Sequence, residues 1–262
     1  MGTRFDSFLQ SLVERLDNEN TIGIAMAGSY ARGDCGPYSD VDIQLFVRQM
    51  PAATNERAYL RCLDGYLVSI SFTTLEDEYA SLRNPKTAIR AIPGLRQLRI
   101  LLDKDGSIAA LKEFAEKTAW EPMQTDANAY ASWNLAGCAE EIHKILAGLA
   151  QKDESKTLYA TWGLTREMAD TLLVLHGVFI PTENAYIDLA QETAGRTSDW
   201  TCLFRQATGL DPHLTDAPAF IGYGAASLRL YRETASLMQM ILQPEDASVV
   251  NRTLQVIAEA GY

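Results

Sequence analysis

Two short apolar runs near the N-terminus constrain the fold of this chain more than any other feature. They cover residues 21–27, TIGIAMA, and 41–47, VDIQLFV, and a stretch rich in glycine, aspartate and proline separates them. Apolar runs of this length, bounded by turn residues, are typical of buried strands. Since the connection between them is short, we expect adjacent or antiparallel strands whose ends meet in a cleft.

The rest of the N-terminal half alternates between helical and strand-like patterns. Helical patterns cover residues 5–16, 54–64, 75–82 and 107–118. Ser107 is the expected N-cap of the last of these helices. Residues 66–73 and 99–103 are the third and fourth predicted strands.

Near residue 122 the character of the chain changes. Strand-like runs nearly vanish, and prolines separate long helical patterns. These patterns cover residues 125–150, 156–178, 183–194, 218–243 and 246–258. The sequence therefore predicts an α+β protein: residues 1–122 form a domain with a mixed sheet of about four or five strands, and residues 123–262 form a helical bundle domain.

The charge of the chain argues against a nucleic-acid partner. It has 34 Asp and Glu against 23 Lys and Arg, for a net charge of −11, whereas nucleic-acid binding draws most of its affinity from basic patches. An acidic chain leaves room for a cationic ligand, although acidity more often serves solubility alone.

Nothing in the sequence indicates a membrane partner or a zinc site. No apolar run approaches the roughly 20 residues that span a bilayer, and the N-terminal MGTRFDSFLQ lacks the apolar core of a signal peptide, so we expect a cytoplasmic protein. The cysteines form no CxxC pair, and we expect reduced, partly buried thiols. The histidines lie too far apart for zinc spacing. The cysteines are Cys35, Cys62, Cys138 and Cys202, and the histidines are His143, His176 and His213.

Candidate chemistry concentrates where the first two strands meet. Asp40 and Asp42 are two residues apart, so their side chains share one face, which Gln44 joins. Two carboxylates in one place repel each other, and a divalent cation such as Mg²⁺, which also takes substrate phosphates as ligands, relieves the repulsion. Gly28 lets the backbone approach a ligand, and Ser29 offers a hydroxyl and N–H groups to phosphate oxygens. The alternative is an ordinary turn followed by a solvated acidic pair.

The stretch GSYARGDCGPYSDVDIQLFV resembles the signature of the DNA polymerase β nucleotidyltransferase superfamily. The matching positions are Gly28, Ser29, Ala31, Arg32, Gly33, Ser39, Asp40 and Asp42. Within that superfamily, the size of the chain, its helical second half and the segment RILLDKDGSI are similar to the small antibiotic nucleotidyltransferases, the lincosamide and aminoglycoside adenylyltransferases.

The resemblance implies an enzyme that uses Mg²⁺ and a nucleoside triphosphate, usually ATP. Asp40 and Asp42 would be catalytic and would bind two Mg²⁺ ions. Gly28 and Ser29 would hold the β- and γ-phosphates, and Arg32 would steady the loop or contact a phosphate, with a surface ion pair as the alternative. A hydroxyl of a small-molecule acceptor, an aminoglycoside or lincosamide bound by the helical domain, would attack the α-phosphorus and release pyrophosphate. The protein would be a monomer or a homodimer.

Two other functions stay open. A regulatory or toxin–antitoxin nucleotidyltransferase would modify protein or RNA, although such proteins are usually short single domains. A catalytically inactive nucleotide-binding protein would explain the third strand, where related families carry a third carboxylate. The best-matching position there is Leu67, and its face then offers only Ser69 and Ser71.

The helical half offers replacements for the missing acid. Glu140 or Glu141 could act as the catalytic base with Lys144 as a phosphate contact, as a glutamate and a lysine do in the aminoglycoside relatives; the alternative is an exposed ion pair along one helix.

Two further groups of residues have open roles. The basic segment from Arg83 to Arg99 could contact a triphosphate or form a flexible surface loop. Aromatic residues of the helical half, among them Trp133, Trp162 and Trp200, could line a pocket, although we expect most of them in the core.

Overall fold

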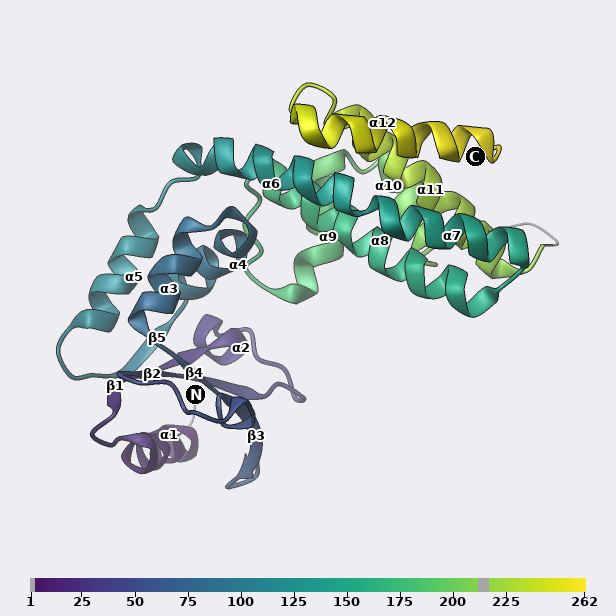
Figure 1. The fold of residues 1–262 in the computed structure, drawn as a ribbon. Helices are drawn as coiled ribbons and strands as arrows, with labels where there is room; N and C mark the ends of the chain where they lie inside the picture. The colour runs from purple at the N-terminus through teal and green to yellow at the C-terminus, as the bar shows by residue number, and fades with distance from the viewer. Residues whose placement is uncertain (1–2, 212–216) are drawn as a thin grey trace. The chain divides into compact units, whose positions relative to one another are not determined.

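The computed structural model describes residues 3–211 and 217–262, so Pro212 and His213 lie outside the described residues. The chain forms two compact units (Figure 1). The N-terminal unit comprises residues 1–119 and 179–182, and the helical unit comprises residues 120–178 and 183–262.

A mixed five-stranded sheet forms the centre of the N-terminal unit. Its strands are β1 (Thr21–Ala27), β2 (Val41–Val47), β3 (Ala58–Leu63), β4 (Tyr66–Thr73) and β5 (Arg99–Asp103), in the order β3-β4-β2-β1-β5. β2 and β4 are parallel, and the other neighbours are antiparallel. The predicted α+β fold with a mixed sheet is thus confirmed.

Helices cover both faces of this sheet. On one face lies α1 (Thr3–Leu16), whose Phe8 and Leu12 pack into one core with Ile43 of β2. On the other face lie α3 (Leu75–Arg83), α4 (Pro85–Arg96) and α5 (Ser107–Lys117) (Figure 1). Because alternate residues of a strand point to opposite faces, Asp42 and Gln44 belong to this second face.

The prediction of a helix over residues 54–64 is wrong. A short 3-10 turn, η1 (Thr54–Glu56), is followed there by β3. Asp64 and Gly65 adopt φ values of 51° and 89°, which is the geometry of a tight hairpin turn, and they fold β3 back onto β4. The cross-strand pairing overrides the local helical pattern.

Two further local predictions in this unit need correction. Ser107 is the first residue of α5 and not its N-cap, a position that Gly106 occupies. The N–H groups of Gly106 and Ala109 donate instead to the carboxylate of Asp103, at 3.0 and 2.9 Å. The basic segment is no flexible loop, because α4 starts at Pro85 behind the capping side chain of Asn84.

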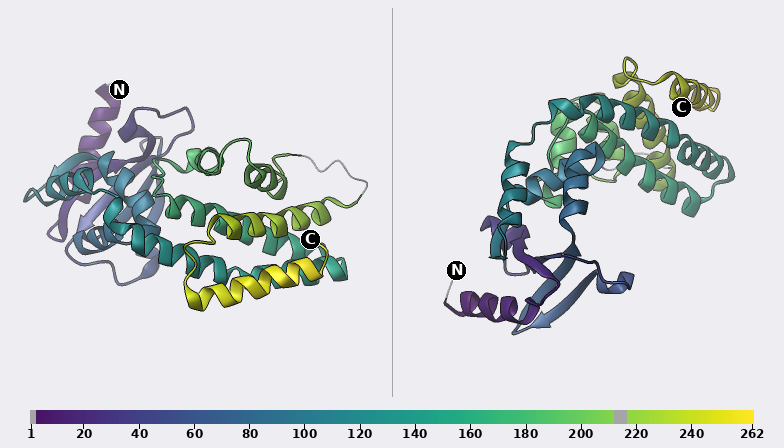
Figure 2. Two further views of the ribbon diagram at one scale, coloured as in Figure 1. Left: turned by 90° about the horizontal axis from the view of Figure 1, so that it is seen from above. Right: turned by 60° about the vertical axis from the view of Figure 1, so that its left-hand side comes forward.

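The helical unit confirms the predicted helical second half. Its helices are α6 (Gln124–Gly137), α7 (Ala139–Gln151), α8 (Glu154–Leu175), α9 (Tyr186–Ala194), α10 (Asp199–Ala207), α11 (Ala219–Leu237) and α12 (Pro244–Glu259), with 3-10 turns η2 (Glu121–Met123) and η3 (Glu183–Ala185). The long helix α8 is buried along most of its length against α6, α7 and α11. Figure 2 shows the long helices of this unit running alongside one another.

The helix boundaries differ from the prediction at two places. The pattern over residues 125–150 forms two helices, which are separated at Cys138. Helix α10 was not predicted; it is short, and the Ser198 side chain caps it by accepting from the Thr201 N–H at 3.1 Å.

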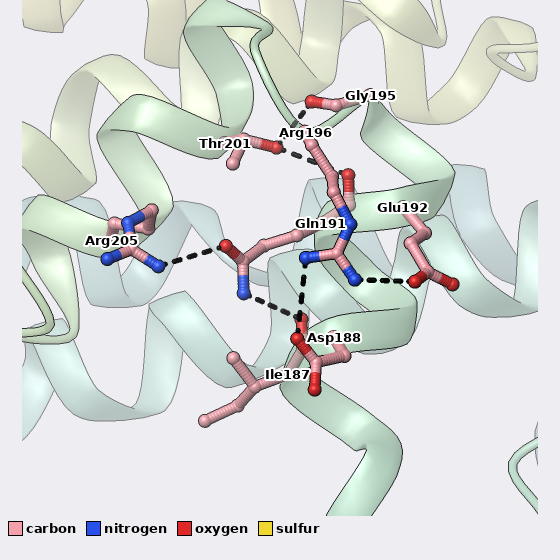
Figure 3. A network of polar contacts seen from close by, with 8 residues as sticks. All are labelled: Ile187, Asp188, Gln191, Glu192, Gly195, Arg196, Thr201 and Arg205. Atoms are coloured by element: carbon pink, nitrogen blue, oxygen red, sulfur yellow. Dashed lines mark hydrogen bonds and ion pairs between the residues drawn. The ribbon is translucent and has the colours of Figure 1, made fainter.

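A polar network ties α9 to α10 (Figure 3). Arg205 donates to Gln191 Oε1 at 3.2 Å, and Thr201 donates to the Gly195 carbonyl oxygen at 2.8 Å. The network thus fixes the turn between α9 and α10, and α10 also buries the rings of Trp200 and Phe204. Over the described ranges, no helix combines the length and the apolar character needed to cross a membrane.

Candidate active site

The antiparallel pairing of β1 and β2 brings the predicted glycine and aspartates together. Ala27, the last residue of β1, is paired with Asp42, the second residue of β2. The short helix α2 (Gly28–Arg32) begins directly after Ala27. Gly28 and Ser29 therefore lie beside Asp42, and Asp40 precedes the same strand by one residue.

Gly28 is required both by its backbone conformation and by the space around it. Its φ of 63° lies in the left-handed region that glycine adopts without strain. A Cβ atom at this position would lie 1.9 Å from Asp42 Oδ2. The carboxylate of Asp42 is thus seated directly against the backbone that starts α2.

The charge at this point is only partly balanced by the protein. Asp42 is half-buried, and burial together with the negative charge of Asp40 raises its pKa, while Arg32 acts in the opposite direction. Arg32 itself donates to Asp34 at 3.1 Å. Arg32 therefore balances only part of the negative charge of Asp40 and Asp42, and a divalent cation between these two carboxylates would balance the rest. Among the described residues, no group of three or more His, Cys, Asp and Glu side chains could hold a metal ion, so any ligand beyond Asp40 and Asp42 would be a neutral protein group, a water molecule or a substrate oxygen.

The start of α2 can accept negative charge. Ala27 at the N-cap provides no side-chain hydrogen bond, so the first N–H groups of the helix are not capped by a side chain. Ser29 adds a hydroxyl group in the same turn. N–H groups and a hydroxyl beside a cation site are suited to phosphate oxygens.

The neighbouring strand β4 offers no acid on the face of Asp42. The parallel register pairs Asp42 with Ser69, and Ser69 is paired in turn with Leu60 of β3. Leu67, where a third carboxylate was expected, lies two residues before Ser69, and 46% of its surface is exposed. Leu60 is also exposed, at 56%, so this part of the face is apolar and open to solvent.

Glu78 of α3 is an acidic residue of this face that was not predicted. Its Oε1 accepts hydrogen bonds from Gln44 Nε2 at 2.6 Å and from Thr73 Oγ1 at 2.9 Å. Burial raises its pKa, although these two donors work in the other direction. The sequence contained a signal, because Glu78 shares the helical stripe of Leu75, Tyr79 and Leu82 and therefore had to face the protein.

The candidate catalytic and phosphate-binding residues of the helical unit, Glu140, Glu141 and Lys144, cluster on α7. Lys144 Nζ lies 2.9 Å from Glu140 Oε1 and 2.8 Å from Glu141 Oε1, the ion pair that was the alternative to a catalytic role. Glu140 is 76% exposed and Glu141 is 24% exposed. Glu141 Oε2 is buried without a hydrogen-bond partner, so Glu141 is the more constrained of the two.

The basic segment is at least partly structural. Arg96 donates to the carbonyl oxygens of Ala115 and Thr118, each at 2.9 Å, and stacks over the ring of Phe179. Its side chain therefore holds the end of α5.

Two side-chain expectations are corrected. Trp133 and Trp162 are 61% and 73% exposed and are not core residues, whereas Trp200 is buried. All four cysteines are free, but only Cys138 is buried, and the other three are exposed.

Several known proteins share the sequence or the fold of this chain. A family model described as a nucleotidyltransferase domain matches residues 6–88, which include β1 to β4. A curated protein of Methanocaldococcus jannaschii, named "Putative protein adenylyltransferase", is 30% identical over 106 residues, which are 38% of this chain and 70% of that protein. A solved nucleotidyltransferase-like protein from Exiguobacterium sibiricum 255-15 has the same fold, with a TM-score of 0.51 and 13% identity over 98% of this chain and 81% of its own.

These matches confirm the predicted superfamily, and none of these relatives is named for an antibiotic. The matched segment contains the glycine, the serine and both aspartates of the site. The chain therefore belongs to the nucleotidyltransferase family, within the DNA polymerase β superfamily.

Proposed function

We propose that the protein transfers AMP from ATP to a hydroxyl group of an acceptor, with Mg²⁺ as cofactor. The contact between Asp42 and Gly28 carries this proposal. It places a carboxylate with unbalanced charge directly against the start of α2. A cation site and a phosphate site then share one corner of the sheet, as a metal–triphosphate complex requires.

Each residue of the corner has a role in this proposal. Bound Mg²⁺ would neutralise the triphosphate and steady the attacking and leaving oxygens. Asp40 and Asp42 would hold the cation, and Ser29 with the first N–H groups of α2 would hold phosphate oxygens. Arg32 would limit the repulsion between the aspartates. Glu141 of the helical unit, paired with Lys144 and partly buried, is the better candidate for a base.

For the acceptor, we favour a small molecule of the aminoglycoside or lincosamide type. The helical unit contains a cavity of about 680 Å³ that Tyr159, Trp162 and Tyr223 line together with threonine side chains. This volume and a mostly apolar lining with a few hydroxyls are usual for small-molecule sites.

A protein hydroxyl is the second candidate acceptor. The relative from Methanocaldococcus jannaschii is named as a protein adenylyltransferase. An exposed apolar strip beside Asp42, with Leu60 and Leu67, would also suit a segment of a partner protein.

The decisive experiment supplies ATP and Mg²⁺ together with either an antibiotic panel or a protein extract. Mass spectrometry then searches for acceptors that gain one AMP unit, and Asp42→Asn is the control. A modified antibiotic supports the first acceptor and a modified protein supports the second. Metal-dependent ATP binding without any pyrophosphate release would refute transfer and leave a nucleotide-binding protein.

A further inference from the structure

The proposed cation site has two protein carboxylates, and a third oxygen donor is available on the same strand face. Gln44 follows Asp42 by two residues in β2, about 7 Å away between Cα atoms. Amide oxygens serve hard cations as neutral ligands. The orientation of the Gln44 amide decides whether it can do so.

Glu78 and Thr73 fix that orientation. Glu78 Oε1 accepts from both Gln44 Nε2, at 2.6 Å, and Thr73 Oγ1, at 2.9 Å. The atom of Gln44 that lies against Glu78 Oε1 is Nε2, so Gln44 presents its NH₂ group, a donor, to the carboxylate. The carbonyl oxygen Oε1 is then directed away from Glu78.

The Oε1 atom of Gln44 has no protein partner in the part of the chain that the structure describes. It is also not among the buried polar atoms that lack a hydrogen bond, so solvent reaches it. A side chain whose nitrogen is held at 2.6 Å while its oxygen is open to solvent is prepared for a ligand on the oxygen side.

We infer that Gln44 Oε1 is a third, neutral oxygen donor to the cation bound by Asp40 and Asp42, directly or through one of its water molecules, and that Glu78 is the residue that positions it. This inference rests on the proposed function, because it uses the cation of that site. Helix α3, through Glu78, would thus support the cation site, to which β4 contributes no acidic residue. Outer partners of this kind typically change metal affinity by about 10–100-fold.

The test measures Mn²⁺ binding by electron paramagnetic resonance, with urea unfolding of the same samples. Gln44→Ala should weaken Mn²⁺ binding about tenfold. Glu78→Gln should weaken it as well, because an amide at residue 78 can donate to Gln44 Oε1 and turn the Gln44 oxygen inward. Ser71→Ala is the matched control: Ser71 lies on β4 in register with Gln44, and its replacement should leave Mn²⁺ affinity unchanged.

The exchange variant Gln44→Glu with Glu78→Gln separates a ligand role from a structural one. In this variant the amide at residue 78 donates to a carboxylate at residue 44. The hydrogen bond is therefore kept with donor and acceptor exchanged, and residue 44 presents a carboxylate to the cation. We expect Mn²⁺ affinity at or above the wild-type value, and lower stability in EDTA because a third carboxylate then lies beside Asp40 and Asp42. If Gln44→Ala and Glu78→Gln change stability and leave Mn²⁺ affinity at the wild-type value, the contact is only structural and the inference is wrong.

Asp42→Asn distinguishes the failure of this inference from that of the proposed function. If Asp42→Asn abolishes Mn²⁺ binding and Gln44→Ala does not weaken it, only the role of Gln44 is refuted. If Asp42→Asn leaves Mn²⁺ binding unchanged, the proposed cation site fails and the role of Gln44 fails with it.

Discussion

Replacing Gly28 by alanine tests the candidate site at its tightest contact. The added Cβ would lie 1.9 Å from Asp42 Oδ2 and 3.0 Å from Asp42 Cγ, so the carboxylate must move by about 1.5 Å to reach an ordinary contact distance. The backbone adds a separate cost. Residue 28 has a φ of 63°, and a residue with a Cβ is less stable in this left-handed region by about 1–2 kcal/mol.

Two measurements separate these costs. Misplacement of a reacting group by about 1 Å costs on the order of 100-fold in rate, so Gly28→Ala should lower AMP transfer, measured as pyrophosphate release, by at least about that factor. Urea unfolding in EDTA should show the backbone cost of about 1–2 kcal/mol.

Gly65→Ala is the matched control for the backbone. Gly65 lies in the β3–β4 turn with a φ of 89°, and a Cβ atom added to it would have no other atom within 4 Å. This variant should lose similar stability and keep its transfer rate. If Gly28→Ala and Gly65→Ala have equal rates, Gly28 does not seat Asp42 and the reasoning fails.

Three other predictions concern single side chains. Burial and the charge of Asp40 raise the folded-state pKa of Asp42 above its ordinary value of 3.8, so ionised Asp42 opposes folding. Asp42→Asn should therefore be more stable than the wild type at neutral pH in EDTA. Urea titrations should show this advantage fading as the pH falls toward 3.8; an advantage that grows in acid contradicts the sign. Thr234→Val should cost about 1–3 kcal/mol, measured by urea unfolding, because the buried Trp200 Nε1 loses its acceptor at 2.9 Å; an unchanged midpoint would contradict this. Burial raises the pKa of Cys138 to about 12, so iodoacetamide should label the other cysteines of the native protein and reach Cys138 only after unfolding, as mass spectrometry can count. Rapid native labelling of Cys138 would refute its burial.

The strands around the site were predictable because their signals are local. The runs at 21–27 and 41–47 are apolar and end at turn residues, and both are strands. Strand β3 was missed because its pattern alone resembles a helix, and only its pairing with β4 decides its state. The Asp64–Gly65 pair was the available hairpin signal.

The site was predictable to the extent that its residues are close in sequence. Gly28 and Asp42 lie within one motif, and the strand pairing that joins them follows from a short connection. Glu78 lies on a later helix, and only the tertiary packing of α3 over β2 brings it to Gln44. No spacing rule connects residues 44 and 78, so the contact had to come from the structure.

An amide in place of a third carboxylate changes how the proposed site would bind its ligands. Two carboxylates repel each other less than three would, so the fold loses less stability when no cation is bound. The same reduction in negative charge lowers the affinity for a cation alone. The triphosphate carries the missing negative charge, and Mg²⁺ is usually bound through one or two carboxylates together with substrate phosphates. We therefore expect the cation and the nucleotide to bind cooperatively at Asp40 and Asp42. The orientation of Gln44 should determine how tightly the cation binds before the nucleotide is present, and therefore how large this cooperativity is.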